Sequence, residues 1–230
     1  MTDIHSHILP NIDDGAQDTE TSVAILEMMR EQNIKKVFAT PHFYPVTTSL
    51  EDFFDSRARS FEALLNAVKG KDLPEIELGC ELLYFRGIGK CDELHKLKMG
   101  DTKYILIEFP SIDITESILR DLSEVFLVGG LVPVIAHTER YFRQKGYKKL
   151  LKFIAEGTIP CLAQVNADSF FDEYYKRVAL KLVKNNNVSF VASDAHSLHS
   201  RKPKMDAAAE LIQRKFGDEV YKRLFFGFTE

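Results

Sequence analysis

The sequence predicts an α/β fold in which parallel strands and helices alternate around a distorted (β/α)7 TIM-like barrel. Short apolar runs are separated by segments with helical spacing, and the runs are apolar on both faces, which is typical of parallel strands covered by helices. Seven such runs follow one another without a repeat or a linker. We therefore expect one closed or nearly closed barrel in a single domain over residues 1–230.

Each expected strand is a short run of apolar residues. The runs lie at Ile4 and at residues 37–40, 76–84, 104–109, 131–136, 161–165 and 188–192. Between most of them apolar residues recur every third or fourth position, which predicts helices over 54–68, 118–126, 175–182 and 205–216. Asp18 and Ser49 are expected N-caps, because their side-chain oxygens can accept a backbone N–H of the first helical turn.

The charge and composition narrow the class of function. Lysine and arginine number 30 and aspartate and glutamate 34, so the net charge is −4 at pH 7 and no stretch is strongly basic. We expect no nucleic-acid partner, because binding a phosphate backbone requires clustered cations. Three cysteines form no disulfide framework, and no leader or membrane-spanning segment is visible, so we expect a cytoplasmic protein without membrane insertion. The sequence carries no signal for an oligomeric state.

Histidines and carboxylates that could bind metal ions fall at the ends of the expected strands. In a barrel of parallel strands these ends meet at one face, where loops build the active site. His5 and His7 are two residues apart, so an extended chain points both the same way, and Asp194 and His196 have the same spacing. Asp14 lies in a turn that can reach this face. The candidate metal ligands are His5, His7, Asp14, His42, Glu81, Glu108, His137, Asp194 and His196.

Five imidazoles and four carboxylates are too many donors for one ion. Because each ion takes about 4–6 ligands, the set suits two or three ions with positions left for water and substrate. Mixed nitrogen and oxygen donors without thiolate suit Mn, Fe or Zn. Three divalent ions would bring six positive charges against four carboxylates, and the surplus of two favours an anionic substrate such as a phosphate ester.

The same positions carry a set of motifs in a characteristic order. They are Asp3-x-His5-x-His7, Thr40-Pro41-His42, the single strand carboxylate Glu81, Glu108-Phe109-Pro110, His137-x-Glu139-Arg140 and Ser193-Asp194-Ala195-His196. Over essentially the whole chain they resemble the polymerase and histidinol phosphatase (PHP) superfamily. More narrowly, the sequence resembles the manganese-dependent protein-tyrosine phosphatases of Gram-positive capsule and exopolysaccharide operons.

The resemblance implies a PHP-type barrel with a three-ion site, in which Mn²⁺ is expected and Fe, Co or Zn are alternatives. One ion would be held by His5, His7, Glu81 and Asp194, a second by Glu81, Glu108 and His137, and a third by Asp14, His42 and His196. Arg140 and Arg201 match the phosphate-binding arginines of the family. Their catalytic role would be to neutralise charge on the phosphoryl oxygens while a water acidified by the ions attacks phosphorus.

Two further features concern the substrate. Tyr44, in the loop that contains His42, is a candidate substrate-binding residue. The segment after Asn166 is rich in aromatic residues, where the family often has glycines. Helical spacing there favours a place in the core, and a phosphotyrosine pocket is the alternative. These aromatic residues are Phe170, Phe171, Tyr174 and Tyr175.

Cys80 and Arg86 match the C-x5-R spacing of cysteine-based tyrosine phosphatases. That chemistry requires a tight loop whose N–H groups wrap the phosphate, followed by a helix N-terminus. The five residues in between are bulky, contain no glycine and are typical of a β-strand. In such a strand the side chains of Cys80 and Glu81 point to opposite faces, so Cys80 faces away from the predicted ligand. We therefore expect the cysteines to be packing residues.

The functional hypothesis is a metal-dependent protein-tyrosine phosphatase. The resemblance implies a phosphotyrosine-containing protein substrate, namely the Tyr-rich tail of a membrane-linked tyrosine autokinase that controls capsular or exopolysaccharide synthesis. One alternative is a small-molecule phosphomonoesterase such as a histidinol phosphatase, which a comparison of kcat/KM values would separate. The other is a non-catalytic metal-bound regulatory module, against which the intact set of costly polar groups argues.

Overall fold

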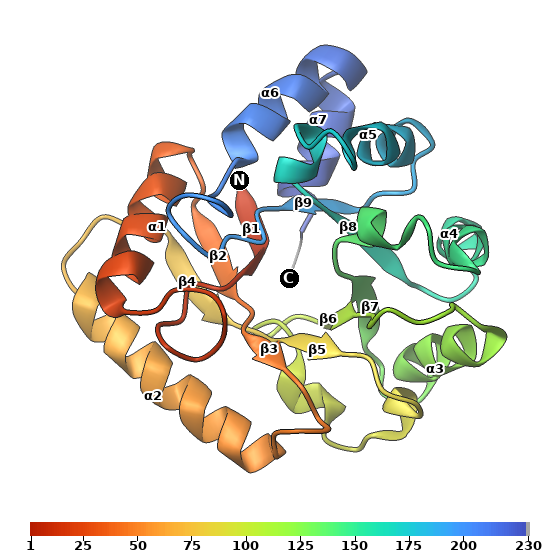
Figure 1. The fold of residues 1–230 in the computed structure, drawn as a ribbon, viewed down its shortest axis with the longest axis horizontal. Coiled ribbons are helices and arrows are strands. Elements are labelled where there is room, and N and C mark those ends of the chain that lie inside the picture. Colours follow the sequence, from red (N-terminus) through yellow and green to blue (C-terminus); the bar gives the residue numbers. More distant parts are fainter. Residues whose placement is uncertain (229–230) are drawn as a thin grey trace.

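Parallel strands are arranged around the centre of the molecule in the computed structural model, which describes residues 1–228 (Figure 1). Every pairing between the strands of this part of the chain is parallel. The strands are β1 (Thr2–Ser6), β2 (Lys36–Ala39), β3 (His42–Phe43), β4 (Glu75–Leu78), β5 (Glu81–Leu83), β6 (Tyr104–Glu108), β7 (Val132–Ile135), β8 (Leu162–Asn166) and β9 (Phe190–Ala192).

Helices lie outside the ring of strands, where each buries its apolar side (Figure 1). They are α1 (Thr19–Glu31), α2 (Leu50–Val68), α3 (Glu116–Leu127), α4 (Tyr147–Glu156), α5 (Lys176–Lys184), α6 (Met205–Phe216) and α7 (Asp218–Phe226). None of the helices in residues 1–228 is long and apolar enough to cross a membrane.

The strands form two sheets, β1-β2-β4 and β3-β5-β6-β7-β8-β9. The third expected strand, residues 76–84, is divided into β4 and β5, and β3 is a short strand beyond the expected second strand that the sequence did not predict. The first sheet thus ends at β4 and the second begins at β3 and β5. Beyond β9, the amide of Asp194 donates to the carbonyl of His5, and that of His7 donates to the carbonyl of Ala195, both at 2.8 Å. The chain thus brings its last strand back to its first, and the predicted α/β fold with a curled parallel sheet is confirmed.

The apolar core has two parts, and the smaller one lies inside the curl of the sheet. It joins Ile4 of β1, Phe38 of β2, Leu106 of β6 and Phe190 of β9 with a few neighbours. The ring of Phe228 packs against those of Phe38 and Phe190, with centroids 5.1 and 5.5 Å apart. The interior is therefore filled by side chains, and buried histidines and carboxylates gather at one end.

A β-bulge turns β1 towards this polar end. Asp3 pairs with Val37 but Ser6 pairs with Ala39, so three residue steps on β1 match two on β2. An extra residue of this kind re-aims the side chains beside it and is common next to active sites. Here it lets His5 face the interior.

Local signals explain most helix boundaries. The carboxylate of Asp18 accepts the amide of Thr21 at 2.7 Å, and the hydroxyl of Ser49 accepts the amide of Asp52 at 3.1 Å, which confirms both expected N-caps. The sequence reasoning did not predict α4 or α7. For α4 the signal was present, since Leu150, Leu151 and Ile154 lie at helical spacing and pack into the core.

Candidate metal centre

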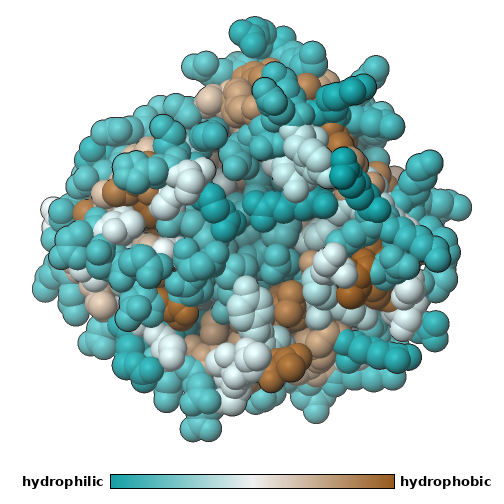
Figure 2. Space-filling model, viewed as in Figure 1, coloured by the Kyte–Doolittle hydropathy of each residue, from teal (hydrophilic) through white to brown (hydrophobic). Residues whose placement is uncertain are grey.

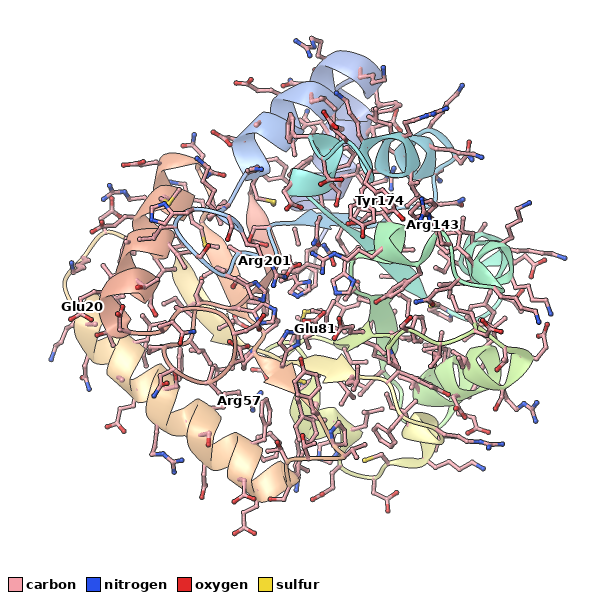
Figure 3. The ribbon with its side chains drawn as sticks, viewed as in Figure 1. Glu20, Arg57, Glu81, Arg143, Tyr174 and Arg201 are labelled. Carbon is pink, nitrogen blue, oxygen red and sulfur yellow. The ribbon has the colours of Figure 1, made fainter. Side chains whose placement is uncertain are left out.

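The nine predicted ligands come together at one end of the barrel. His5 lies in β1, His42 and Glu81 begin β3 and β5, Glu108 ends β6, and the other five lie in the loops after β1, β7 and β9. Glu81 and Arg201 mark the opening (Figure 3). The middle of this face is hollowed and mainly hydrophilic (Figure 2). His5 and His7 are fully buried, whereas 63% of the Asp14 side chain is exposed. The donors therefore run from the interior of the barrel to its open mouth.

Glu81 is the centre of the donor cluster, because four imidazoles face its carboxylate. Its Oε1 lies 3.0 Å from Nε2 of His137. Its Oε2 lies 3.1 Å from Nδ1 of His42 and 3.2 Å from Nε2 of both His5 and His7. A carboxylate with donors on both oxygens is suited to bridge two ions.

Asp14 and Asp194 extend the cluster towards the mouth. Oδ1 of Asp14 lies 3.3 Å from Nε2 of His42 and 3.4 Å from Nε2 of His196. Oδ1 of Asp194 lies 3.4 Å from Nε2 of His5 and 3.5 Å from Nδ1 of His196. Through these contacts the first and the last strand supply donors to one site.

Glu108 approaches from β6, with 22% of its side chain exposed. Its Oε1 lies 3.4 Å from Nε2 of His137, and its Oε2 lies 3.9 Å from Nδ1 of His42. All nine predicted ligands are thus linked by contacts of less than 4 Å.

The donor atoms form three groups in which all members lie within 4.8 Å of one another. The groups are His7, Asp14, His42 and His196; His5, His7 and Glu81; and His42, Glu81 and Glu108. They overlap with the three ligand sets that the family resemblance implies. They differ from those sets because Asp194 and His137 belong to none of the three groups, and His42 accompanies Glu81 and Glu108 in place of His137. In addition, His7 and His42 each belong to two groups.

Several buried donor atoms in this cluster face other donor atoms at 3.1–3.5 Å but form no hydrogen bond of acceptable geometry. They include Oε2 of Glu81, Nδ1 of His42, Oδ1 of Asp194 and Nε2 of His196. A buried polar atom without a partner costs about 1–3 kcal/mol, so such a concentration is unusual. Cations placed among these atoms would satisfy all of them, and imidazole and carboxylate are the donors that Mn, Fe and Zn accept. The residues present therefore fit a metal centre.

The other ring nitrogens of the histidines contact fixed oxygens, which orient the rings. Nδ1 of His5 lies 3.2 Å from Oε1 of Gln164, and Nδ1 of His7 lies 2.7 Å from Oδ2 of Asp13. A ring that donates through Nδ1 presents an unprotonated Nε2 to a metal ion. The geometry therefore selects the tautomer that can bind a metal.

Gln164 and Asn166, on β8, extend this support. Oε1 of Gln164 also accepts the amide of His137 at 2.7 Å, and its Nε2 donates to Oδ1 of Asn166 at 2.8 Å. Nδ2 of Asn166 donates in turn to Oδ2 of Asp194 at 2.7 Å. These connected hydrogen bonds thus position three predicted ligands, His5, His137 and Asp194.

Sequence reasoning did not identify Asp13, Gln164, Asn166 or Tyr141 as site residues. Tyr141 accepts the amide of Phe109 at 3.0 Å, and its hydroxyl lies 3.2 Å from Nδ1 of His137. Only β8 gave a usable signal, because Gln164 and Asn166 are polar residues with strand alternation at the end of an otherwise apolar run.

Two of the predicted ligands have left-handed backbone conformations. φ is +30° at His137 and +52° at Asp194, values that are costly for residues other than glycine and that concentrate at functional sites. The expectation that strand alternation aligns Asp194 with His196 is therefore wrong, since β9 ends at Ala192. The two side chains converge through a turn, whose start is fixed by the amide of Ser193 donating to Asp3 at 2.9 Å.

The pKa values of two neighbouring histidines in the cluster, His7 and His196, are shifted in opposite directions. Burial alone would lower the pKa of His7, but Asp13 and Glu81 outweigh it and raise the pKa to about 10. Burial and the neighbouring charge of His7 lower the pKa of His196 to about 3. The two rings are 3.8 Å apart between centroids, so they cannot easily both carry a charge. Of the two rings, His7 therefore holds a second proton more strongly than His196.

Arg140 and Arg201 meet at the mouth on one carboxylate. Each donates through a terminal nitrogen to Oδ2 of Asp194, at 2.9 and 2.8 Å respectively. About a third of each side chain is exposed, 32% and 33%, so both guanidinium groups remain accessible to an anion. Tyr44 lies nearby, with its ring stacked on that of His42 at 5.1 Å between centroids.

The structure also shows where the aromatic segment after Asn166 and Cys80 lie. In the aromatic segment Phe170 is fully buried in the core, whereas Phe171 and Tyr174 are exposed, so the core interpretation holds for only part of it. Cys80 is buried, and its Sγ contacts the carbonyl of Leu97 at 3.4 Å, away from the metal ligands. It is a packing residue, as predicted.

Comparison with known proteins identifies the family. The model of a family described as capsular polysaccharide synthesis, CpsB/CapC, matches residues 1–230. The chain belongs to the CpsB/CapC family. It is 31% identical to the tyrosine-protein phosphatase CpsB of Streptococcus pneumoniae, covering 98% of this chain and 95% of that protein. It is 32% identical to the tyrosine-protein phosphatase YwqE of Bacillus subtilis (strain 168), covering 96% and 87%.

Solved structures agree with this assignment to the CpsB/CapC family. One comes from crystal structures of YwqE from Bacillus subtilis and CpsB from Streptococcus pneumoniae, described as unique metal-dependent tyrosine phosphatases. It has a TM-score of 0.81 and 29% identity, and covers 96% of this chain and 90% of that chain. A histidinol phosphate phosphatase from Lactococcus lactis has a TM-score of 0.55 with 14% identity, covers 93% and 92%, and shares the fold. The predicted resemblance to capsule-operon tyrosine phosphatases with a PHP-type fold is thus confirmed.

Proposed function

We propose that the nine clustered donors hold up to three divalent ions, Mn²⁺ foremost, and that this chain uses them to hydrolyse phosphotyrosine in proteins. The observation that carries the proposal is the arrangement around Glu81, where four imidazoles face one buried carboxylate and leave donor atoms without partners. Membership of the CpsB/CapC family, whose relatives are named tyrosine-protein phosphatases, supports the same conclusion.

Bound ions would supply two things, a water acidified at neutral pH and positive charge for the phosphoryl oxygens. The protein's own side chains bind and orient the phosphate group. Arg140 and Arg201 each present a guanidinium at the mouth, and a guanidinium matches phosphate with two parallel donors. A tyrosyl leaving group has an ordinary pKa of about 10, so it departs more easily than a serine alkoxide and needs no dedicated general acid.

The buried walls of the site set its specificity for a phosphoryl group. Asp14 and Glu108 are the more exposed carboxylates of the cluster, while the innermost donors are closed to solvent. An anionic group that enters the mouth therefore meets Arg140, Arg201 and the ion-binding donors together. Tyr44, stacked on His42, offers an aromatic surface at the rim for the ring of the substrate.

The partner proposed for this site is a phosphotyrosine-containing protein, the membrane-linked tyrosine autokinase of a capsule or exopolysaccharide system. The family assignment to capsular polysaccharide synthesis supports it. We also propose a cytoplasmic location, where the phosphorylated tail of such a kinase would lie. The free thiols of Cys80, Cys91 and Cys161 are consistent with a reducing compartment.

The test combines metal analysis with two substrates. The purified protein is stripped with a chelator, reloaded with Mn²⁺, and assayed with p-nitrophenyl phosphate and a phosphotyrosyl peptide. We expect no turnover by the stripped protein and full turnover after reloading, with two or three ions bound per chain by elemental analysis. Full activity in excess chelator, or no turnover of the phosphotyrosyl peptide by the loaded protein, would overturn the proposal. A higher kcat/KM for histidinol phosphate than for the peptide would reassign the substrate class.

A further inference from the structure

A groove of about 460 Å³ lies between α4 and α5, outside the metal centre. Its floor is apolar and includes Leu151 from α4, Val178 from α5 and Phe142 from the loop before α4. These side chains pack on the core from outside and remain only partly buried. The groove therefore offers an apolar surface to a ligand that runs along the two helices.

The charge at the rim of this groove has one sign. Lys148, Arg177 and Lys181 line it and are exposed, and no acidic side chain lines it. Within residues 1–228 none of these three cations has a carboxylate within salt-bridge distance. Two other lysines of α4 do have acidic partners: Lys149 pairs with Glu116 at 2.7 Å, and Lys152 pairs with Glu156 at 3.5 Å. An unpaired set of cations in a chain of net charge −4 attracts an anionic partner.

Phe142 connects the groove to the chain segment that contains Arg140. Phe142 follows Arg140 by two residues, and its ring lies 5.3 Å from that of Tyr174 between centroids. The guanidinium of Arg143 lies 4.5 Å above the ring of Tyr174 and 5.3 Å from that of Phe142. Figure 3 shows Arg143 and Tyr174 on the α4–α5 side of the opening that contains Arg201 and Glu81. A peptide leaving the opening on this side passes over exposed aromatic and cationic side chains.

We propose that the groove between α4 and α5 binds an acidic stretch of the phosphoprotein substrate, so that the enzyme selects phosphotyrosines with acidic residues nearby in the chain. The proposal rests on the proposed function, because the acidic stretch and the phosphotyrosine belong to one polypeptide. The three unpaired cations bind its carboxylates, and the apolar floor accepts the aliphatic or aromatic side chains between them. Electrostatic matching of this kind raises the rate of encounter and selects partners.

The experiment uses two phosphotyrosyl peptides of equal length, one with glutamates on both sides of the phosphotyrosine and one with glutamines at the same positions. The protein is loaded with Mn²⁺, and p-nitrophenyl phosphate is assayed in parallel. We expect kcat/KM to be about fivefold higher for the glutamate peptide at low salt, since a few exposed ion pairs contribute a few tenths of a kcal/mol each. The preference should disappear at about 1 M salt, where charges are screened within a few ångströms.

Two double variants with the same change in charge locate the effect. Lys148→Glu/Lys181→Glu reverses the charge of two of the groove's three cations, and Lys149→Glu/Lys152→Glu changes the paired lysines of the neighbouring helix face. We expect the first to abolish the preference through a rise in KM for the glutamate peptide, with p-nitrophenyl phosphate turnover unchanged. The second should keep the preference, and both should keep the wild-type thermal midpoint.

Three results would overturn the groove as a docking site. They are equal kcat/KM values for the two peptides with the wild-type protein, an equal loss of preference in both double variants, and an unchanged preference in Lys148→Glu/Lys181→Glu. Failure of the proposed function is distinguishable, because the loaded wild-type protein would then turn over neither phosphotyrosyl peptide. In that event, fluorescence anisotropy with the same two peptides still compares their binding to the groove.

Discussion

The guanidinium of Arg140 donates to Oδ2 of Asp194 at 2.9 Å, while Oδ1 of the same carboxylate lies 3.4 Å from Nε2 of His5. One carboxylate therefore links a predicted phosphate-binding arginine to the predicted metal ligands. The same Oδ2 also accepts hydrogen bonds from Arg201 and Asn166. Asp194 can lose one of these partners without losing its position.

This redundancy predicts how Arg140→Ala behaves. We expect kcat/KM for p-nitrophenyl phosphate to fall by about 10²–10³-fold, the usual effect of removing one donor to a developing anion. Metal content should be unchanged, because Arg201 and Asn166 still hold Asp194. Arg143→Ala is the control, since Arg143 contacts the rings of Phe142 and Tyr174 rather than the donor cluster. Loss of bound metal in Arg140→Ala would show that the arginine is structural.

Gln164→Leu tests the support beneath the ligands. The substitution removes the acceptor for Nδ1 of His5 and for the amide of His137. We expect metal affinity to fall by about 10–100-fold, which is typical of losing such outer contacts. The measurement is competition for Mn²⁺ with a chromophoric chelator, together with circular dichroism to show that the fold is kept.

The matched control is Gln213→Leu, because Gln213 is exposed on α6 and donates only to Asp218. It should bind Mn²⁺ like the wild type. An unchanged affinity in Gln164→Leu would mean that the ring of His5 is oriented by packing alone.

Glu81→Gln tests whether one carboxylate joins the donor groups. Glu81 belongs to two of the three groups, and its neutral amide replacement loses both the charge and one of the two oxygens. We expect the number of ions per chain to fall by at least one and turnover to be lost. Metal binding by the wild type should raise its stability by about 2.7 kcal/mol at a free concentration 100 times Kd, and the variant should show a smaller rise in thermal midpoint.

Glu75→Gln is the control for this change, since Glu75 is exposed at the start of β4 and lies outside all three groups. Both ion content and midpoint should match the wild type. If Glu81→Gln retained the full ion content, the bridging role would be wrong.

The sequence could predict the barrel and the candidate ligands because both follow from periodicity. Strand ends of one polarity meet at one face, so polar residues at those ends, such as His42 and Glu108, can be grouped before any coordinates exist. The family motifs then reduced the possible functions from metal-dependent enzymes in general to a protein-tyrosine phosphatase.

The residues that support the ligands, the turn at Asp194 and the α4–α5 groove could not be predicted, because they depend on tertiary contacts that no local sequence pattern contains. Asp194 reaches the site through a left-handed turn, and Asp13, unlike the exposed Asp14, is buried against Nδ1 of His7. The unpaired cations of the α4–α5 groove were also hidden, because pairing of Lys149 but not Lys148 is decided by where α3 packs.

Cys80 provides a test that separates metal from cysteine chemistry. Burial raises the pKa of its thiol to about 12, so at pH 8 the group remains in the unreactive thiol form. Since the shift is upward, reactivity should increase only as pH rises towards 12. We expect iodoacetamide at pH 8 to leave Cys80 unmodified while Cys91, which is partly exposed, reacts. Cys80→Ala should retain turnover of p-nitrophenyl phosphate, and Cys91→Ala serves as the control for the reagent. Loss of turnover on alkylation in Cys91→Ala, with modification mapped to Cys80, would contradict a mechanism that relies on the metal ligands.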